Sequence, residues 1–157
     1  MSESKRTWFI TGVSSGLGRA IAKAALSRGD VVIGTLRQAA QMVEFEALAQ
    51  GRAVACQLDV ADENTLHESV TQAVERAGGV DIVVHCAGYG LCGAAEELSD
   101  AESRAQMETN FFGLVGVTQA ALPFMRAQRR SFREHLVCRR LSGHSRYVDV
   151  QRFEVCR

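Results

Sequence analysis

Residues 8–18 of the chain read WFITGVSSGLG, an apolar run that leads into a turn with glycines at positions 12, 16 and 18. The alanine-rich segment that follows predicts a helix, so the turn joins a strand to a helix N-terminus. Free backbone N–H groups and the positive end of the helix dipole favour a phosphate there. Glycine lets a pyrophosphate approach the backbone closely. The candidate phosphate-binding residues are Gly12, Ser14, Ser15, Gly16, Leu17 and Gly18.

The residues after the last glycine indicate which class of phosphate-containing ligand the turn would bind. A nucleoside triphosphate site of the Walker type carries a Lys-Ser/Thr pair directly after its last glycine. Here Arg19 and Ala20 follow Gly18, which favours a dinucleotide over ATP or GTP. The alternative is a strand-to-helix turn of an α/β protein that binds no phosphate.

Hydrophobic periodicity predicts that strands and helices alternate up to Phe124. One apolar helix face is clear where Leu66, Val70 and Val74 recur at helical spacing. Such alternation predicts an α/β fold whose parallel strands are joined by right-handed crossovers, with helices on both faces of the sheet. The expected strands are residues 7–11, 31–35, 53–58 and 81–85, and the expected helices are residues 17–27, 38–50, 62–77 and 100–124.

The composition changes abruptly near Arg130. Residues 1–125 carry 15 acidic and 9 basic side chains, a net charge of −6, whereas residues 126–157 carry 9 arginines and 3 acids, a net charge of +6. Glycine nearly vanishes after Gly116, and no strand or helix period is sustained from Ser131. We therefore expect a dinucleotide-binding domain at residues 1–130 and an irregular arginine-rich tail at residues 131–157. An incomplete sheet of about four strands would leave its fourth strand with an unpaired edge.

The five cysteines show no C-x-x-C spacing, which argues against a zinc site or a redox motif. We expect no metal site and reduced, mostly buried thiols. The sequence from Met1 to Thr11 has no apolar run long enough for a signal peptide, and no segment is long and apolar enough to cross a membrane. These features predict a cytoplasmic chain with no membrane partner.

The second expected strand ends at Thr35-Leu36-Arg37. In dinucleotide-binding α/β folds a carboxylate at this place holds the ribose hydroxyls of NAD, whereas an arginine accepts the 2′-phosphate of NADP. Arg37 therefore favours NADP(H), with NAD(H) as the other option, because a guanidinium forms charge-assisted, often forked hydrogen bonds with phosphate. The alternative for Arg37 is a solvated surface side chain.

Polar and small residues follow the third and fourth expected strands. Asp59 and Val60 lie at the sheet edge where ligands bind, and Asp59 either accepts a hydrogen bond from the adenine amino group or caps the next helix. Ala87 and Gly88 let a flat ring lie against the backbone. His85 lies inside its strand, so we expect a structural role for it.

Asn110 lies among apolar neighbours in the longest expected helix. An unpaired buried amide is costly, so Asn110 should have a hydrogen-bonding partner.

Together these residues resemble the short-chain dehydrogenase/reductase family. Thr11-Gly12-x-x-x-Gly16-x-Gly18, Asp59, Ala87-Gly88-Tyr89-Gly90 and Asn110 stand in the family's order and spacing, and the likeness covers Arg6 to about Arg130. It implies a Rossmann-type fold, a bound NADP(H) or NAD(H), and hydride transfer between a small-molecule alcohol and a carbonyl. It also implies pairing of two copies, as a homo-oligomer, through the helix that contains Asn110 once the fold is complete.

The chain departs from the family pattern in two places. His85-Cys86 stands where members usually have Asn-Asn. Members also carry a catalytic serine, then a tyrosine that acts as the general acid/base and a lysine four residues later that lowers its pKa. Tyr147 is followed four places later by Gln151, so this role is not transferred to Tyr147. Asn110 is the one catalytic residue that the resemblance assigns, and we expect the chain as written to be inactive.

The neighbouring reading frame offers an explanation of the tail. Read one nucleotide on from about Ser131, the codons of residues 133–138 permit GNILF, which resembles the family's fifth strand. The codons of residues 150–155 permit YSASKF, which holds the missing tyrosine and lysine at the family's spacing. We therefore predict a frameshift in residues 131–157. The alternative is a non-catalytic nucleotide-binding module whose natural basic tail binds a partner. The tail lacks the aromatic interleaving of nucleic-acid-binding segments, so we expect no nucleic-acid partner.

Overall fold

A sheet covered by helices on both faces forms the framework of the protein. The computed structural model describes residues 5–127, 135–140 and 148–153. Strands and helices first alternate as β1 (Thr7–Thr11), α1 (Gly16–Ser27), β2 (Val31–Leu36), α2 (Ala40–Glu46), β3 (Ala53–Gln57), α3 (Glu63–Ala77) and β4 (Ile82–His85). There follow the 3-10 helix η1 (Ala95–Glu97), α4 (Asp100–Met107), the π-helix η2 (Glu108–Phe112), α5 (Gly113–Ala127), β5 (His135–Arg140) and β6 (Val148–Phe153).

The strand order of the sheet is β3-β2-β1-β4-β5-β6. Strands β1 to β5 pair in parallel, and β6 pairs with β5 in the antiparallel direction. The chain moves outward from β1 to β2 and β3, then returns to place β4 on the other side of β1. This reversal makes the carboxyl ends of β1 and β4 the place where such a sheet binds ligands. The predicted α/β fold with a parallel Rossmann-type sheet is confirmed for β1 to β4.

The backbone after Arg130 departs from the predicted irregular tail at two segments, His135–Arg140 and Val148–Phe153, which form β5 and β6. Val83 to His85 of β4 pair with β5, so the prediction that β4 has an unpaired edge is wrong. The physical reason is that an edge strand has unpaired N–H and C=O groups, which can form hydrogen bonds with another strand such as β5. The other tail residues lie outside the described part of the chain. The predicted frameshift concerns the reading frame of the gene and stays a prediction.

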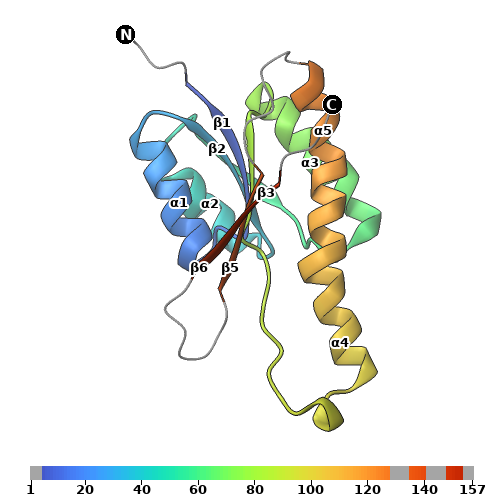
Figure 1. Ribbon diagram of the computed structural model, residues 1–157. Helices are drawn as coiled ribbons and strands as arrows, with labels where there is room; N and C mark the ends of the chain where they lie inside the picture. The colour runs from blue at the N-terminus through green and yellow to red at the C-terminus, as the bar shows by residue number, and fades with distance from the viewer. Residues whose placement is uncertain (1–4, 128–134, 141–147, 154–157) are drawn as a thin grey trace.

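Two clusters of apolar side chains hold the layers together. Helices α1 and α2 lie on one face of the sheet, and α3 and α5 lie on the other (Figure 1). Phe9 and Ile10 are both fully buried and belong to different clusters, Phe9 with the α3 and α5 side and Ile10 with the α1 and α2 side. Consecutive buried positions are typical of parallel strands, which are covered on both faces.

The two largest differences from the predicted helices are the end of α2 and the interruption of the long helix. Helix α2 ends at Glu46, four residues before its predicted end, and a turn follows in which the Leu48 N–H bonds the Phe45 carbonyl at 3.1 Å. The predicted helix 100–124 is α4, η2 and α5 in succession. Within the described ranges, no helix has both the length and the hydropathy that crossing a membrane requires.

Candidate cofactor-binding site

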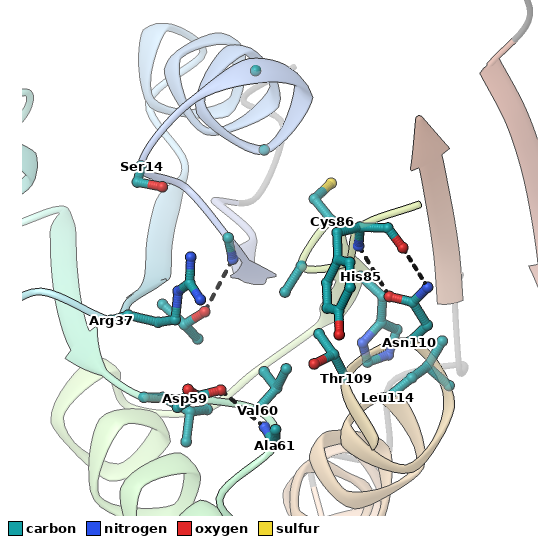
Figure 2. A pocket seen from close by; sticks show the side chains of 18 of the residues that line it. Ser14, Arg37, Asp59, Val60, Ala61, His85, Cys86, Thr109, Asn110 and Leu114 are labelled. Atoms are coloured by element: carbon teal, nitrogen blue, oxygen red, sulfur yellow. Dashed lines mark hydrogen bonds between the residues drawn. The ribbon is translucent and has the colours of Figure 1, made fainter. Parts of the chain in front are cut away.

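A cleft of about 860 Å³ opens where the loops after β1, β2, β3 and β4 meet the helical segment α4–η2. Figure 2 shows side chains from these loops turned toward one another across the cleft. Its volume lies in the range of small-molecule and cofactor sites, about 300–1,000 Å³. All the residues that the sequence singles out for cofactor binding line it: Gly12, Ser14, Ser15, Gly16, Leu17, Gly18, Arg37, Asp59, Val60, Ala87, Gly88 and Asn110.

The glycine-rich turn fits a phosphate group. Gly16 has φ +59°, and a Cβ there would meet no atom within 4 Å, so the backbone beside it faces open space. Helix α1 begins at Gly16 with no side-chain hydrogen bond from its N-cap Ser15 and no acidic residue in its first turn. The first amides of a helix lack partners within the helix. They are therefore available to an anionic ligand, which the helix dipole also favours.

The other two glycines of the turn serve close packing. A Cβ on Gly18 would lie 2.3 Å from the Gly12 carbonyl oxygen, far inside contact distance. Gly12 has φ +72°, and a Cβ on it would lie 3.0 Å from the Ala87 backbone. Side chains at these positions would push the turn away from α1 and from the end of β4.

Two buried threonines join the strand ends beneath the cleft. The Thr35 hydroxyl accepts a hydrogen bond from the Gly12 N–H at 3.0 Å. The Thr11 hydroxyl accepts from the Cys86 and Ala87 N–H groups, each at 3.0 Å. Sequence reasoning assigned no role to either hydroxyl. The available signal was a threonine near the carboxyl end of each of two otherwise apolar strands.

Arg37 lies in the cleft as an exposed side chain. Among the described residues its guanidinium has no hydrogen bond or ion pair, and only its backbone carbonyl accepts a bond, from Gln57 Nε2 at 3.5 Å. A free guanidinium beside the glycine-rich turn is positioned to take an anion. The same geometry is compatible with a solvated side chain.

Asp59 faces the cleft and does not cap the next helix. Its Oδ1 accepts a hydrogen bond from the Ala61 N–H at 3.1 Å, a local turn at the end of the strand. The N-cap of α3 is Asp62, whose side chain accepts from the Asn64 N–H. The hydrogen bond from the Thr65 hydroxyl lowers the pKa of Asp62. The capping alternative for Asp59 is therefore wrong.

Asn110 has the partner that its position predicts. Its Nδ2 donates to the Tyr89 carbonyl at 2.8 Å and its Oδ1 accepts from the Tyr89 N–H at 3.0 Å. Asn110 lies in the π-helix η2, a local widening that often occurs at functional sites. A Cβ on Gly88 would lie 2.9 Å from Asn110 Oδ1. The helix thus fixes the loop after β4, which forms one wall of the cleft.

His85 is fixed between β4 and α5, as a structural histidine would be. It is buried, and its Nε2 lies 3.2 Å from the Thr118 hydroxyl. The Thr118 hydroxyl donates its proton to the Leu114 carbonyl at 2.8 Å. Thr118 therefore links the His85 ring to the backbone of the first turn of α5.

The cysteines differ in burial more than predicted. Of the three whose side chains the structure describes, Cys56 is buried, Cys86 is half-buried and Cys92 is exposed. The prediction of mostly buried thiols is therefore wrong for Cys92. Among residues 5–127, 135–140 and 148–153, no group of three or more His, Cys, Asp or Glu side chains could hold a metal ion.

Cys56 should resist alkylation while Cys92 reacts. Burial raises the pKa of Cys56 to about 11, an effect that the nearby Arg76 charge partly offsets. Because the thiolate is the reactive form, only about one Cys56 thiol in a thousand would be ionised at pH 8. Peptide mapping after brief iodoacetamide treatment of the native protein should find the label on Cys92 and not on Cys56. Labelling of both at equal rates would contradict this assignment.

The structure is an α/β protein with a Rossmann-type sheet and a cleft at the carboxyl ends of its strands, and comparison with known proteins gives its family. The short chain dehydrogenase family model matches residues 6–131, most of the chain. This chain belongs to the short-chain dehydrogenase family. The match ends beside Arg130, where the composition changes.

Similar proteins share the N-terminal part of this family. An oxidoreductase of Botryotinia fuckeliana is 40% identical over 125 residues, which cover 79% of this chain and 46% of that protein. A 3-ketodihydrosphingosine reductase of Bacteroides thetaiotaomicron is 35% identical, over 77% of this chain and 42% of its own length. The chain therefore spans less than half the length of these relatives.

Solved structures of similar proteins have the same fold over most of this chain. A short-chain dehydrogenase from Streptomyces avermitilis aligns with a TM-score of 0.75 and 42% identity, over 82% of this chain and 47% of that one. L-sorbose reductase from Gluconobacter frateurii, solved in complex with NADPH and L-sorbose, aligns with a TM-score of 0.71 and 29% identity, over 80% of this chain and 49% of that one.

Proposed function

We propose that this chain is the cofactor-binding part of an oxidoreductase that transfers a hydride between a small-molecule alcohol and a carbonyl, and that it prefers NADP(H) to NAD(H). Family membership supports the reaction class. The observation that carries the cofactor preference is the free guanidinium of Arg37 in the same cleft as the glycine-rich turn. NADP(H), when bound, supplies or accepts the hydride.

Each part of a dinucleotide has a matching group of residues in the lining of the cleft. The amides at the start of α1 would hold the diphosphate, and Arg37 would pair with the 2′-phosphate. Asp59 would accept a hydrogen bond from the adenine amino group. Ala87 and Gly88 would lie against the nicotinamide ring, since neither carries a side chain larger than a methyl group. Through its two bonds to Tyr89, Asn110 would keep this wall in place.

Arg37→Asp should reverse the cofactor preference. The arginine's hydrogen bonds to phosphate would contribute about 1.5–3 kcal/mol, or about 10- to 150-fold in affinity. The aspartate would repel the 2′-phosphate and favour the ribose hydroxyls of NAD. The dissociation constants of NADPH and NADH should be measured by calorimetry.

Lys23→Asp is the matched control, because it makes the same charge change at an exposed position of α1 that does not line the cleft. It should leave the NADPH to NADH ratio as it is in the parent chain. Equal affinities for both cofactors in the parent would remove Arg37 from cofactor selection.

A further inference from the structure

The segment that carries Arg37 is bonded to the glycine-rich turn at both ends. At the β2 end, the Thr35 hydroxyl accepts from the Gly12 N–H and the Thr35 carbonyl accepts from the Val13 N–H at 3.1 Å. At the α2 end, Glu44 forms an ion pair with Arg19 of α1. Arg37 lies between these two attachments in the sequence.

Arg19 makes the second attachment with two arms of its guanidinium. Its Nη1 donates to the Ser14 carbonyl at 3.3 Å, and its Nη2 bonds Glu44 Oε1. One side chain thus joins the turn, the first turn of α1, and α2. A planar guanidinium with fixed donors can hold two partners at once, which a lysine ammonium does with less geometric definition.

The ion pair of Arg19 with Glu44, called the bridge below, lies beside the cleft and can act on it indirectly. Arg19 and Glu44 are absent from the cleft lining, whereas Ser14 and Arg37 belong to it. The Arg19 side chain is 28% exposed, and its partner Glu44 is 63% exposed, so the ion pair lies at the surface beside the cleft. Arg19 acts on the cleft through the residues to which it is bonded.

We propose that Arg19 and Glu44 are positioning residues for NADP selectivity: they fix the Arg37 segment at a set separation from the phosphate-binding turn. This inference rests on the proposed function. NADPH uses both subsites at once, its 2′-phosphate at Arg37 and its diphosphate at the turn, whereas NADH uses only the turn. A pre-arranged pair of subsites lowers the ordering cost of a ligand that occupies both. Loss of the bridge should therefore weaken NADPH binding and spare NADH.

The test measures NADPH and NADH affinities of the whole 157-residue chain by fluorescence titration for Arg19→Ala, Glu44→Gln and the double variant. Partly exposed ion pairs make small contributions, so each single variant should lower NADPH affinity about two- to fivefold and leave NADH affinity nearly unchanged. The double variant should be no worse than Arg19→Ala alone, because Arg19→Ala already removes the pair with Glu44. Arg19→Lys should recover part of the loss.

Arg76→Ala is the matched control. Arg76 pairs with Glu46 at 3.4 Å and joins α2 to α3, and neither residue lines the cleft. Its loss should change thermal stability to a similar extent without changing the NADPH to NADH ratio. If Arg19→Ala does not fold, Glu44→Gln carries the same test.

The possible results distinguish failure of the positioning role of Arg19 and Glu44 from failure of the proposed NADP preference. A parent chain that binds neither cofactor, or that binds both equally, refutes the proposed NADP preference and the bridge with it. A parent that prefers NADPH, with the same preference in Arg19→Ala and Glu44→Gln, refutes the bridge alone. Equal losses of NADPH and NADH also overturn it, because they would mean that Arg19 shapes only the turn.

Discussion

The purified chain is expected to turn over no alcohol or carbonyl, whereas the same gene read in the neighbouring frame from about Ser131 is expected to yield an active enzyme. General acid/base catalysis contributes about 10²–10⁴-fold to a rate. In the sequence as written, Gln151 stands four residues after Tyr147, so we expect Tyr147 not to replace the family's tyrosine and lysine pair. NADPH oxidation should be followed with a panel of ketones and aldehydes for both proteins.

The control for this experiment is the frame-restored protein with its new tyrosine replaced by phenylalanine. It should bind NADPH normally and lose activity, which would show that the restored residue acts in the chemical step. Turnover by the chain as written would contradict the prediction. A frame-restored protein that binds NADPH without turnover would contradict the predicted frameshift.

Replacing Gly18 with alanine is expected to reduce NADPH affinity more than 100-fold and to destabilise the protein. The added Cβ would lie 2.3 Å from the Gly12 carbonyl oxygen and 3.2 Å from the Cys86 Cβ. Such overpacking costs about 1–3 kcal/mol of folding stability. The turn must also shift, and loss of two hydrogen bonds to a charged phosphate costs at least about 3 kcal/mol. Urea unfolding and calorimetric titration would measure the two effects.

Gly51→Ala provides a control that is destabilised without affecting the cleft. Gly51 has φ +73° and no atom within 4 Å of an added Cβ, so alanine there would bring backbone strain but no clash. For a residue with a side chain, this left-handed conformation lowers folding stability by about 1–2 kcal/mol. Gly51→Ala should therefore lose stability and bind NADPH as the parent does. A Gly18→Ala protein that binds as well as Gly51→Ala would contradict the packing account.

Local patterns in the sequence predicted most of the fold. The first strand was predicted with its observed bounds, Thr7–Thr11, because apolar runs between glycine-containing turns reflect burial directly. The π-helix at Glu108–Phe112 was not predicted, because hydrophobic period does not distinguish one widened turn. Strands β5 and β6 were not predicted either, because pairing with the edge of β4 can impose an extended backbone on a segment without a strand period.

The residues lining the cleft were predictable for a topological reason, whereas the bonds beneath it were not. Parallel strands place all their carboxyl ends at one edge of the sheet, so residues after each strand meet there. The bond from Gly12 to Thr35 and the pair of Arg19 with Glu44 join residues 23 and 25 positions apart. No repeat or motif marks such pairs, because they depend on how two elements pack.

The position of β1 in the middle of the sheet has a consequence for how the chain folds as it is made. Strand β1 pairs with β2 through Thr7 and Val31, but its other neighbour is β4, where Trp8 pairs with Ile82. A ribosome adds about 5–20 residues per second, so several seconds separate the synthesis of these two partners. During that interval the central strand has a partner on only one side. Completion of the sheet therefore waits for a pairing distant in sequence, the kind of step that makes folding slow.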